Sequence, residues 1–497
     1  MKTAIWTLLA LAVPLTAPLA ASAQVNSDEA AMKRFIDALR IVEDNAADPV
    51  DTETAFNQGA IPGLLRHLDP HSVFFPADQF EQLNEMESSV HKGFGTVVSI
   101  LPGRVVVLQT LPNTPSARAG MMPGDEILAV NNYRLDRLEP EQIIGLLNES
   151  KQKPVQLVVR HPGNVRLAEL TMVPEDMQTS SVERAFLLQP GIAYLRVASF
   201  EGNTGGQIGA AIEKLGGRAL KGLVLDLRNN PGGVMTAALG TASLFLQPGQ
   251  EILRARGRNV PETIERVPAD VKPYAFPVAL IVNGKSASAS EIVAGALQDH
   301  DRAVIVGESS FGKGLIQSVY PLSGKAGLAL TTALYYIPSG RSIQKPFPRE
   351  EFDLQATARH PNERTDFKTD NGRPVPGGGG IIPDIGVLPP EMNAFRTAME
   401  ASGSFTEFAA EFVRDNKITG GWEVPPQMLD RFQIWLSEHH IQPSLREYLA
   451  EREFIRLRLK TEIYNLALGV EKGDEIDAQR DPQIQKALQV VLDPPRR

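Results

Sequence analysis

The chain has 497 residues and a formal net charge of −9, from 50 basic and 59 acidic side chains. This length suggests about three domains of ordinary size, and a mildly acidic chain without a long basic run is a poor binder of nucleic acid. Because there is no Cys and the eight His lack metal-ligand spacing, disulfides and thiolate metal sites are excluded, and we predict no metal and no cofactor.

Residues 1–23 have the features of a secretory signal peptide. Lys2 gives a short positive region, residues 4–20 are almost wholly apolar, and Ala21-Ser22-Ala23 offers small residues for cleavage. No later run approaches the ~18 apolar residues that a membrane span needs. We therefore expect cleavage after Ala23, export to the periplasm and a mature chain without a membrane span. Loss of Lys2 would move the net charge from −9 to −10.

Residues 24–88 are expected to form an N-terminal helical region. Apolar side chains recur at helical spacing in two groups, Met32, Phe35, Ile36, Leu39 and Val42, and then Phe56, Leu64, Leu65 and Leu68. Since such a stripe is usually buried, we expect these helices to pack against the folded body.

Residues 89–176 form a region of short β segments with one helix. Strands are predicted at residues 96–100, 104–108, 126–130 and 155–160, and a helix at 140–148. The run from Ser116 to Leu128 resembles the most recognisable stretch of PDZ domains, and Gly93-Phe94-Gly95 matches their carboxylate-binding loop. A PDZ domain adds a chain terminus to its sheet and holds the carboxylate on loop amides. A purely structural β domain is the alternative.

Residues 177–390 alternate strands and helices, the order expected of an α/β sheet. Strands are predicted at residues 193–197, 222–227, 278–282 and 303–306, with helices near 206–215 and 234–245.

A serine-rich turn in this region offers a nucleophile. It reads Ser286-Ala287-Ser288-Ala289-Ser290 and joins a buried strand to a helix, a place where a hydroxyl is exposed near the positive end of the helix dipole. Lys313 lies 25 residues after Ser288, between two glycines and after an apolar strand. A lysine can take the proton of a serine only as the neutral amine, which burial favours.

These residues resemble the carboxyl-terminal processing (tail-specific) proteases. That family has the nucleophile as the middle serine, a lysine 25 residues later and a glutamine four beyond it, which Ser288, Lys313 and Gln317 match. Three further segments are similar to the family's glycine turn and flanking signatures: Leu225 to Gly233, Leu68-Asp69-Pro70-His71-Ser72 and Gly380-Ile381-Ile382-Pro383-Asp384. The resemblance covers residues 30 to 390, approximately.

The resemblance implies an α/β fold: a crotonase-like ββα protease core with an inserted PDZ domain and flanking N- and C-terminal helical regions. It implies a serine endopeptidase that cleaves proteins near their C-terminus, with Ser288 as nucleophile, Lys313 as general base and Gln317 holding the amine. The oxyanion hole would use amides of Ala289 and of Gly232 or Gly233, and the tail carboxylate would bind at Gly93, Phe94 and Gly95.

Other interpretations of these residues remain. Ser286 and Ser290 are expected to be turn or cap residues, and Gln317 could be an ordinary polar residue on a strand. The opposing functional class is a binding protein with the same fold and a disabled site. Such a protein should have lost Ser288 or Lys313, and both are present.

Residues 391–497 are expected to be helical. An apolar stripe ends at Gly469, a plausible helix stop, and consists of Leu445, Tyr448, Leu449, Ile455, Leu459, Ile463 and Leu466. Packing within the chain and homo-oligomerisation through these helices are equally open. The expected partners are proteins or peptides with a free C-terminal tail, and an adaptor or activating protein is a further candidate.

Overall fold

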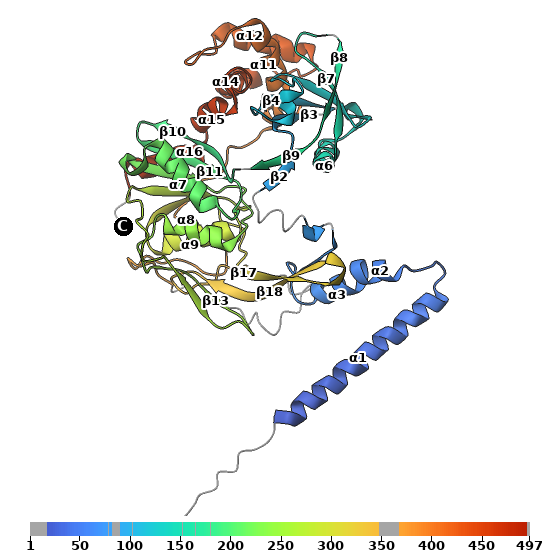
Figure 1. The fold of residues 1–497 in the computed structure, drawn as a ribbon. Coiled ribbons are helices and arrows are strands. Elements are labelled where there is room, and N and C mark those ends of the chain that lie inside the picture. Colours follow the sequence, from blue (N-terminus) through green and yellow to red (C-terminus); the bar gives the residue numbers. More distant parts are fainter. Residues whose placement is uncertain are drawn as a thin grey trace, which may run out of the picture.

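The computed structural model describes residues 17–77, 79–81, 90–101, 103–151, 153–164, 166–178, 180–346 and 367–494. N-terminal helices, a β domain, an α/β body and C-terminal helices follow one another along the chain (Figure 1). Residues 1–16 of the expected leader lie outside the described ranges, and the expected cleavage site after Ala23 falls within the first helix. None of the helices in these ranges combines the length and the apolar character that a bilayer crossing requires.

The N-terminal region is helical, as expected. It contains α1 (Ala17–Asn45), α2 (Thr52–Thr54), a π-helical turn (Ala55–Ala60) and α3 (Ile61–Arg66), and strand β1 (Val73–Phe75) follows.

The expectation that the apolar stripe of α1 packs against the core is wrong. Helix α1 extends away from the body (Figure 1), and Met32 and Phe35 are 61% and 41% exposed. The centroid of the Phe35 ring lies 5.5 Å from that of Phe56, in the neighbouring π-helical turn. Helical spacing therefore predicted the helix correctly, but it does not determine which surface covers the stripe.

The β domain has the predicted PDZ-like elements. Its antiparallel sheet has the order β3 (Thr96–Leu101), β4 (Arg104–Thr110), β5 (Glu126–Val130), β7 (Val155–Arg160) and β8 (Leu167–Met172), with β6 (Tyr133–Arg134) beside β5. Helix α5 (Pro115–Arg118) and helix α6 (Pro140–Ser150) complete it. Apolar residues from the sheet and from α6 form one buried core, which includes Val105, Ile127, Ile143 and Leu157.

Both connections of this domain to the rest of the chain run together. Strand β2 (Val90–Gly93) enters the domain and β9 (Glu175–Gln178) leaves it, and the two pair antiparallel, with Gly93 opposite Glu175. The β domain is therefore an insertion carried on a two-stranded ribbon.

The α/β body is built on a six-stranded sheet. Its order is β10 (Val182–Gln189), β11 (Ile192–Val197), β12 (Gly222–Asp226), β15 (Val278–Val282), β16 (Ala303–Gly307) and β19 (Ile385–Gly386), and only the β10–β11 pair is antiparallel. Helices α7 (Thr204–Leu215), α8 (Met235–Ser243) and α9 (Ala289–Asp299) pack on one face. The predicted strands are buried on both faces, which explains their uninterrupted apolar sequences.

A second sheet packs beside α9 and was not predicted. It has the order β1, β18 (Gly327–Tyr336), β13 (Glu251–Arg256) and β14 (Thr263–Arg266), and β17 (Leu315–Pro321) also pairs with β18. The N-terminal region therefore contributes an edge strand to the body, which brings residues near position 70 close to those near 317.

The C-terminal region is helical: α10 (Ala394–Ala401), α11 (Ser404–Asp415), α12 (Pro426–Glu438), α13 (Leu445–Ala450), α14 (Arg452–Leu468), α15 (Val470–Ala478) and α16 (Pro482–Leu492). Most of the predicted stripe is buried within the chain, although Leu445 and Leu449 are exposed, and Gly469 follows the end of α14. Leu108 of the β domain packs against this helical core, while α16 covers the second face of the six-stranded sheet. These helices thus contact both the β domain and the body.

Candidate active site

The serine-rich turn lies between β15 and α9, where the sequence placed it. Ser288 is partly exposed and adopts a φ of 52°, a conformation that residues other than glycine rarely take. Ser286 and Ser290 are buried, and their hydroxyls donate to the carbonyls of Leu227 at 2.7 Å and Asn230 at 3.1 Å. The central hydroxyl is therefore the accessible one of the three.

Lys313 and Gln317 come together on the loop before β17 and on β17 itself. The Lys313 Nζ donates to Gln317 Oε1 at 2.8 Å, and Gln317 Nε2 donates to the carbonyl of His71 at 2.5 Å. Burial lowers the pKa of the Lys313 amine, while the nearby charges of Asp69 and Glu291 partly oppose that shift. A larger fraction of this lysine is therefore neutral than of an exposed one.

A buried carboxylate joins the two loops, and the sequence analysis did not single it out. Glu291 Oε2 accepts hydrogen bonds from the amides of Ser288 and Lys313, both at 2.9 Å. Its Oε1 accepts from the amide of Gly312 at 2.7 Å and from Ser310 Oγ at 2.5 Å. Burial raises the pKa of Glu291, whereas these donors act in the opposite direction. The signal in the sequence was the Ser-x-x-Glu spacing of a helix capping box at the start of α9.

A buried tyrosine binds the carbonyl side of the same two loops. The Tyr335 hydroxyl on β18 lies 2.9 Å from the carbonyl oxygen of Lys313 and 3.2 Å from that of Ser288. The loops are thus held through both their amides and their carbonyls. No local pattern in the sequence indicates this role for Tyr335.

The glycine turn, which contains Gly232 and Gly233, lies directly against the serine-rich turn. A methyl group on Gly232, whose φ is +99°, would be 2.7 Å from the carbonyl oxygen of Ala287 and 3.0 Å from the amide of Ala289. The amide of Gly232 itself donates to Asn230 Oδ1 at 2.9 Å. Ala289 is the first residue of α9, where amides have no acceptor within the helix, and the Gly233 amide has no acceptor among the described residues.

The hydrogen bonds of the described residues do not include one between Ser288 Oγ and the Lys313 amine. The loops that carry these groups are adjacent, since Glu291 and Tyr335 bind both of them. In the described ranges, acidic and His side chains form no cluster of three or more that could hold a metal ion.

In the Gly93-Phe94-Gly95 segment, Gly93 is the last residue of β2, and Phe94 and Gly95 connect it to β3. The carbonyls of Phe94 and Gly95 accept from the amides of Ser116 at 3.0 Å and Leu111 at 2.8 Å. The amides of Phe94 and Gly95 have no acceptor within the part of the chain that the structure describes. Gly95 has a φ of +79°, and a methyl group there would lie 2.3 Å from Thr114 Cβ, so this position requires glycine.

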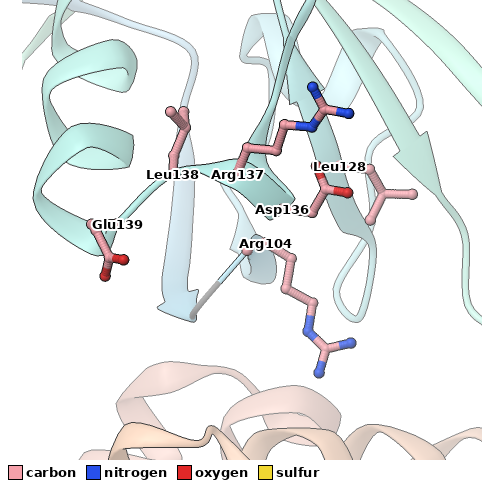
Figure 2. Close-up of a pocket in the computed structure, with 7 residues that line it drawn as sticks. Arg104, Leu128, Asp136, Arg137, Leu138 and Glu139 are labelled. Carbon is pink, nitrogen blue, oxygen red and sulfur yellow. The ribbon is translucent and has the colours of Figure 1, made fainter.

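A polar pocket of about 580 Å³ lies elsewhere on the β domain (Figure 2). Its lining is formed by Gly103, Arg104, Leu128, Asp136, Arg137, Leu138 and Glu139. The Arg104 side chain points toward the C-terminal helices and pairs with Glu407 of α11. None of the predicted site residues lines this pocket.

Comparison with known proteins identifies the family. Residues 191–348 match Peptidase family S41, and residues 106–161 match the PDZ domain. The chain is 35% identical over 293 residues to the "Carboxy-terminal-processing protease" of Bartonella bacilliformis, covering 58% of this chain and 67% of that protein. It is 34% identical over 315 residues to the "C-terminal processing peptidase, chloroplastic" of Tetradesmus obliquus, covering 60% of this chain and 68% of that protein.

Among solved structures, the chain is similar to a "Photosystem II D1 C-terminal processing protease", with 26% identity and a TM-score of 0.39 over 71% of this chain and 86% of that one. Because this TM-score is low, the family assignment rests on the sequence relatives. With the α/β body, the inserted PDZ domain and these relatives, the chain belongs to the carboxy-terminal processing proteases of peptidase family S41.

Proposed function

We propose that this serine-type peptidase works in the periplasm with Ser288 as nucleophile and Lys313 as general base, and that its PDZ domain delivers the C-terminal tail of protein substrates. The observation that carries the proposal is the joining of the two loops by Glu291, with the Lys313 amine held by Gln317. The opposing class, a binding protein with a disabled site, is disfavoured because Ser288, Lys313 and Gln317 are all present.

In the proposed reaction, the neutral Lys313 amine takes the proton of Ser288 as Oγ bonds to the scissile carbonyl carbon. The carbonyl oxygen becomes an oxyanion, and we propose that the amides of Ala289 and Gly233 stabilise it. Gly232 shapes the turn, since its own amide is bound to Asn230. The protonated amine then donates to the leaving nitrogen as the C–N bond breaks, and water hydrolyses the acyl-enzyme by the same proton transfers.

Gln317 is proposed to hold the amine near the nucleophile. Since the described hydrogen bonds do not join Ser288 Oγ to Lys313, we propose that side-chain rotation closes this contact when substrate binds.

The PDZ domain is proposed to bind the substrate tail at Gly93, Phe94 and Gly95. The support is that the amides of Phe94 and Gly95 have no acceptor among the described residues and lie at the start of β3, the strand beside α6. A terminal carboxylate could accept from these amides while the peptide pairs with β3. We also propose that tail binding gates the peptidase.

The remaining proposals concern organisation and partners. We propose a signal peptide at 1–23, an N-terminal helical region at 24–88, the PDZ domain at 89–176, the peptidase at 177–390 and a C-terminal helical region at 391–497. The β2–β9 ribbon supports the limits of the PDZ domain. Adaptor binding and homo-oligomerisation stay proposals, and the burial of most C-terminal apolar residues favours packing within the chain.

Ser288→Ala should abolish peptide cleavage and leave folding intact, because its hydroxyl is at a partly exposed turn outside the core. Cleavage of an unstructured protein is followed by mass spectrometry, and folding by circular dichroism. Ser309→Ala, an exposed serine on the lysine loop, is the matched control and should cleave normally. Retained cleavage by Ser288→Ala would move the nucleophile to Ser286 or Ser290.

Lys313→Ala should lower turnover by roughly 10²-fold to 10⁴-fold, the usual range for general acid–base catalysis. Lys313→Arg should fail as well, because arginine stays protonated. Since the neutral amine is required and burial lowers its pKa, kcat/KM should rise with pH through an apparent pKa below the ordinary lysine value of 10.5. Stopped cleavage assays across pH measure this limb. A rate that falls as pH rises through that range would contradict the role of the amine.

Glu291→Ala should disable the site and destabilise the fold. It leaves the amides of Ser288, Gly312 and Lys313 without their buried acceptor, and each unsatisfied donor costs about 1–3 kcal/mol. Urea unfolding and peptide cleavage measure the two effects. Glu308→Ala removes a partly exposed carboxylate from the loop that carries Lys313 and should change neither stability nor activity. Wild-type stability and activity in Glu291→Ala would show that the carboxylate does not hold the loops.

Amidation of a substrate peptide's C-terminus should weaken its binding, because it removes the charge that the PDZ amides would hold. Replacing Gly95 by Val should do the same, since Val tolerates neither the positive φ nor the contact with Thr114. Calorimetry measures binding and mass spectrometry measures cleavage, with Gly59→Val, outside the domain, as control. Equal behaviour of free-acid and amidated peptides in both assays would show that the domain does not read a chain terminus.

A further inference from the structure

The Leu68-Asp69-Pro70-His71-Ser72 segment lies beside the proposed base, far from it in sequence. Strand β1 begins at the next residue and pairs with β18, with Val73 opposite Ala329. Strand β18 also pairs with β17, which carries Gln317. The turn before β1 is therefore held, through β18, beside β17, whose Gln317 binds the amine of Lys313.

Asp69 closes this turn. Its side chain is buried, and Oδ1 accepts from the amides of His71 at 2.7 Å and Ser72 at 2.8 Å. Its Oδ2 accepts from Ser72 Oγ at 2.7 Å, and the same hydroxyl accepts from the amide of Thr331 on β18 at 3.1 Å. The carboxylate thus fixes both the shape of the turn and its attachment to the sheet.

This turn also fixes the orientation of the Gln317 side-chain amide. Its Nε2 group donates to the carbonyl of His71, so its Oε1 is directed at the Lys313 amine. A flipped amide would turn its oxygen toward the His71 carbonyl, which removes that hydrogen bond. It would also point N–H donors at the lone pair with which the neutral Lys313 amine acts as a base. The position of the His71 carbonyl therefore selects the orientation of Gln317 that holds the amine.

Charge adds a second connection between the turn and the base. Lys313 interacts electrostatically with three titratable groups. The charges of Asp69 in the turn and Glu291 in α9 raise the pKa of the Lys313 amine, and Lys313 in return lowers the pKa of His71 in the turn. The negative charge of Asp69 favours the protonated amine, and burial and Lys313 both lower the pKa of His71, which favours its neutral form.

We propose that Asp69 is a positioning residue of the peptidase, which acts through the His71 carbonyl and the Gln317 amide to hold the Lys313 amine in place. The proposal rests on the proposed role of Lys313 as base. The turn at residues 68–72 then belongs to the active site and does more than attach β1 to the second sheet.

Two variants separate the contributions of shape and charge. Asp69→Ala releases the turn, and a displacement of a catalytic group by about 1 Å can cost 10²-fold, so kcat should fall by about 10-fold to 100-fold with little change in KM. Asp69→Asn keeps an oxygen for the amides of His71 and Ser72 but removes the charge that raises the pKa of Lys313, so the rising limb of the kcat/KM pH profile should shift to lower pH. Asp51→Asn, an exposed cap of α2, is the matched control and should match the wild type.

The pH profile distinguishes this role from a merely structural one, and thermal unfolding is measured on every variant. Unchanged kcat in a folded Asp69→Ala overturns the proposal, and an unshifted limb in Asp69→Asn shows that Asp69 does not act on the amine through its charge. If Asp69→Ala does not fold, Ser72→Ala takes its place, because it removes the hydrogen bonds of the Ser72 hydroxyl to Asp69 Oδ2 and to the Thr331 amide. Unchanged kcat in Ser72→Ala then overturns the proposal. A limb that persists in the residual activity of Lys313→Ala would instead overturn the assignment of Lys313 as base.

Discussion

The arrangement of this site depends on the hydrogen bonds that the buried carboxylate of Glu291 accepts. It accepts hydrogen bonds from the amides of Ser288 and Lys313, which lie on loops that follow different strands of the sheet. A carboxylate can be buried only where donors compensate for lost hydration, and four donors surround this one. The same requirement that makes Glu291 stable in the interior therefore fixes the two loops relative to each other.

Two of the signature segments, at residues 68–72 and 380–384, extend this network. Ser310, which donates to Glu291, accepts from the amide of Ile381 at 2.6 Å and donates its own amide to the Ile381 carbonyl at 3.1 Å. On the other side, the turn that Asp69 closes contacts Gln317. Each of these segments thus contacts the loops of Ser288 and Lys313 through one hydrogen-bonded side chain, that of Ser310 or that of Gln317.

Sequence patterns predicted some of this structure and could not predict the rest. Uninterrupted apolar runs gave the buried strands of the six-stranded sheet, because both faces are covered. Strand β18 was missed because its apolar residues fall on both faces, so no alternation of period two is visible in the sequence. The stripe of α1 identified a helix but not its surroundings, which depend on tertiary contacts.

The site shows the same division. The spacing of Ser288, Lys313 and Gln317 was visible in the sequence, and the capping-box spacing marked Glu291. The Tyr335 hydroxyl and the His71 carbonyl are brought to the site by the pairing of β1, β17 and β18. No pattern in the sequence around either residue predicts this placement.

The proposed mechanism depends on activation of the Ser288 hydroxyl by Lys313. Reaction of the intact protein with a fluorophosphonate, followed by tandem mass spectrometry, measures this activation, because such reagents bond covalently to activated serine hydroxyls. One adduct is expected, on Ser288, which forms faster as pH rises and is lost in Lys313→Ala. An adduct on another serine, or labelling of Ser288 at an unchanged rate in Lys313→Ala, would contradict it.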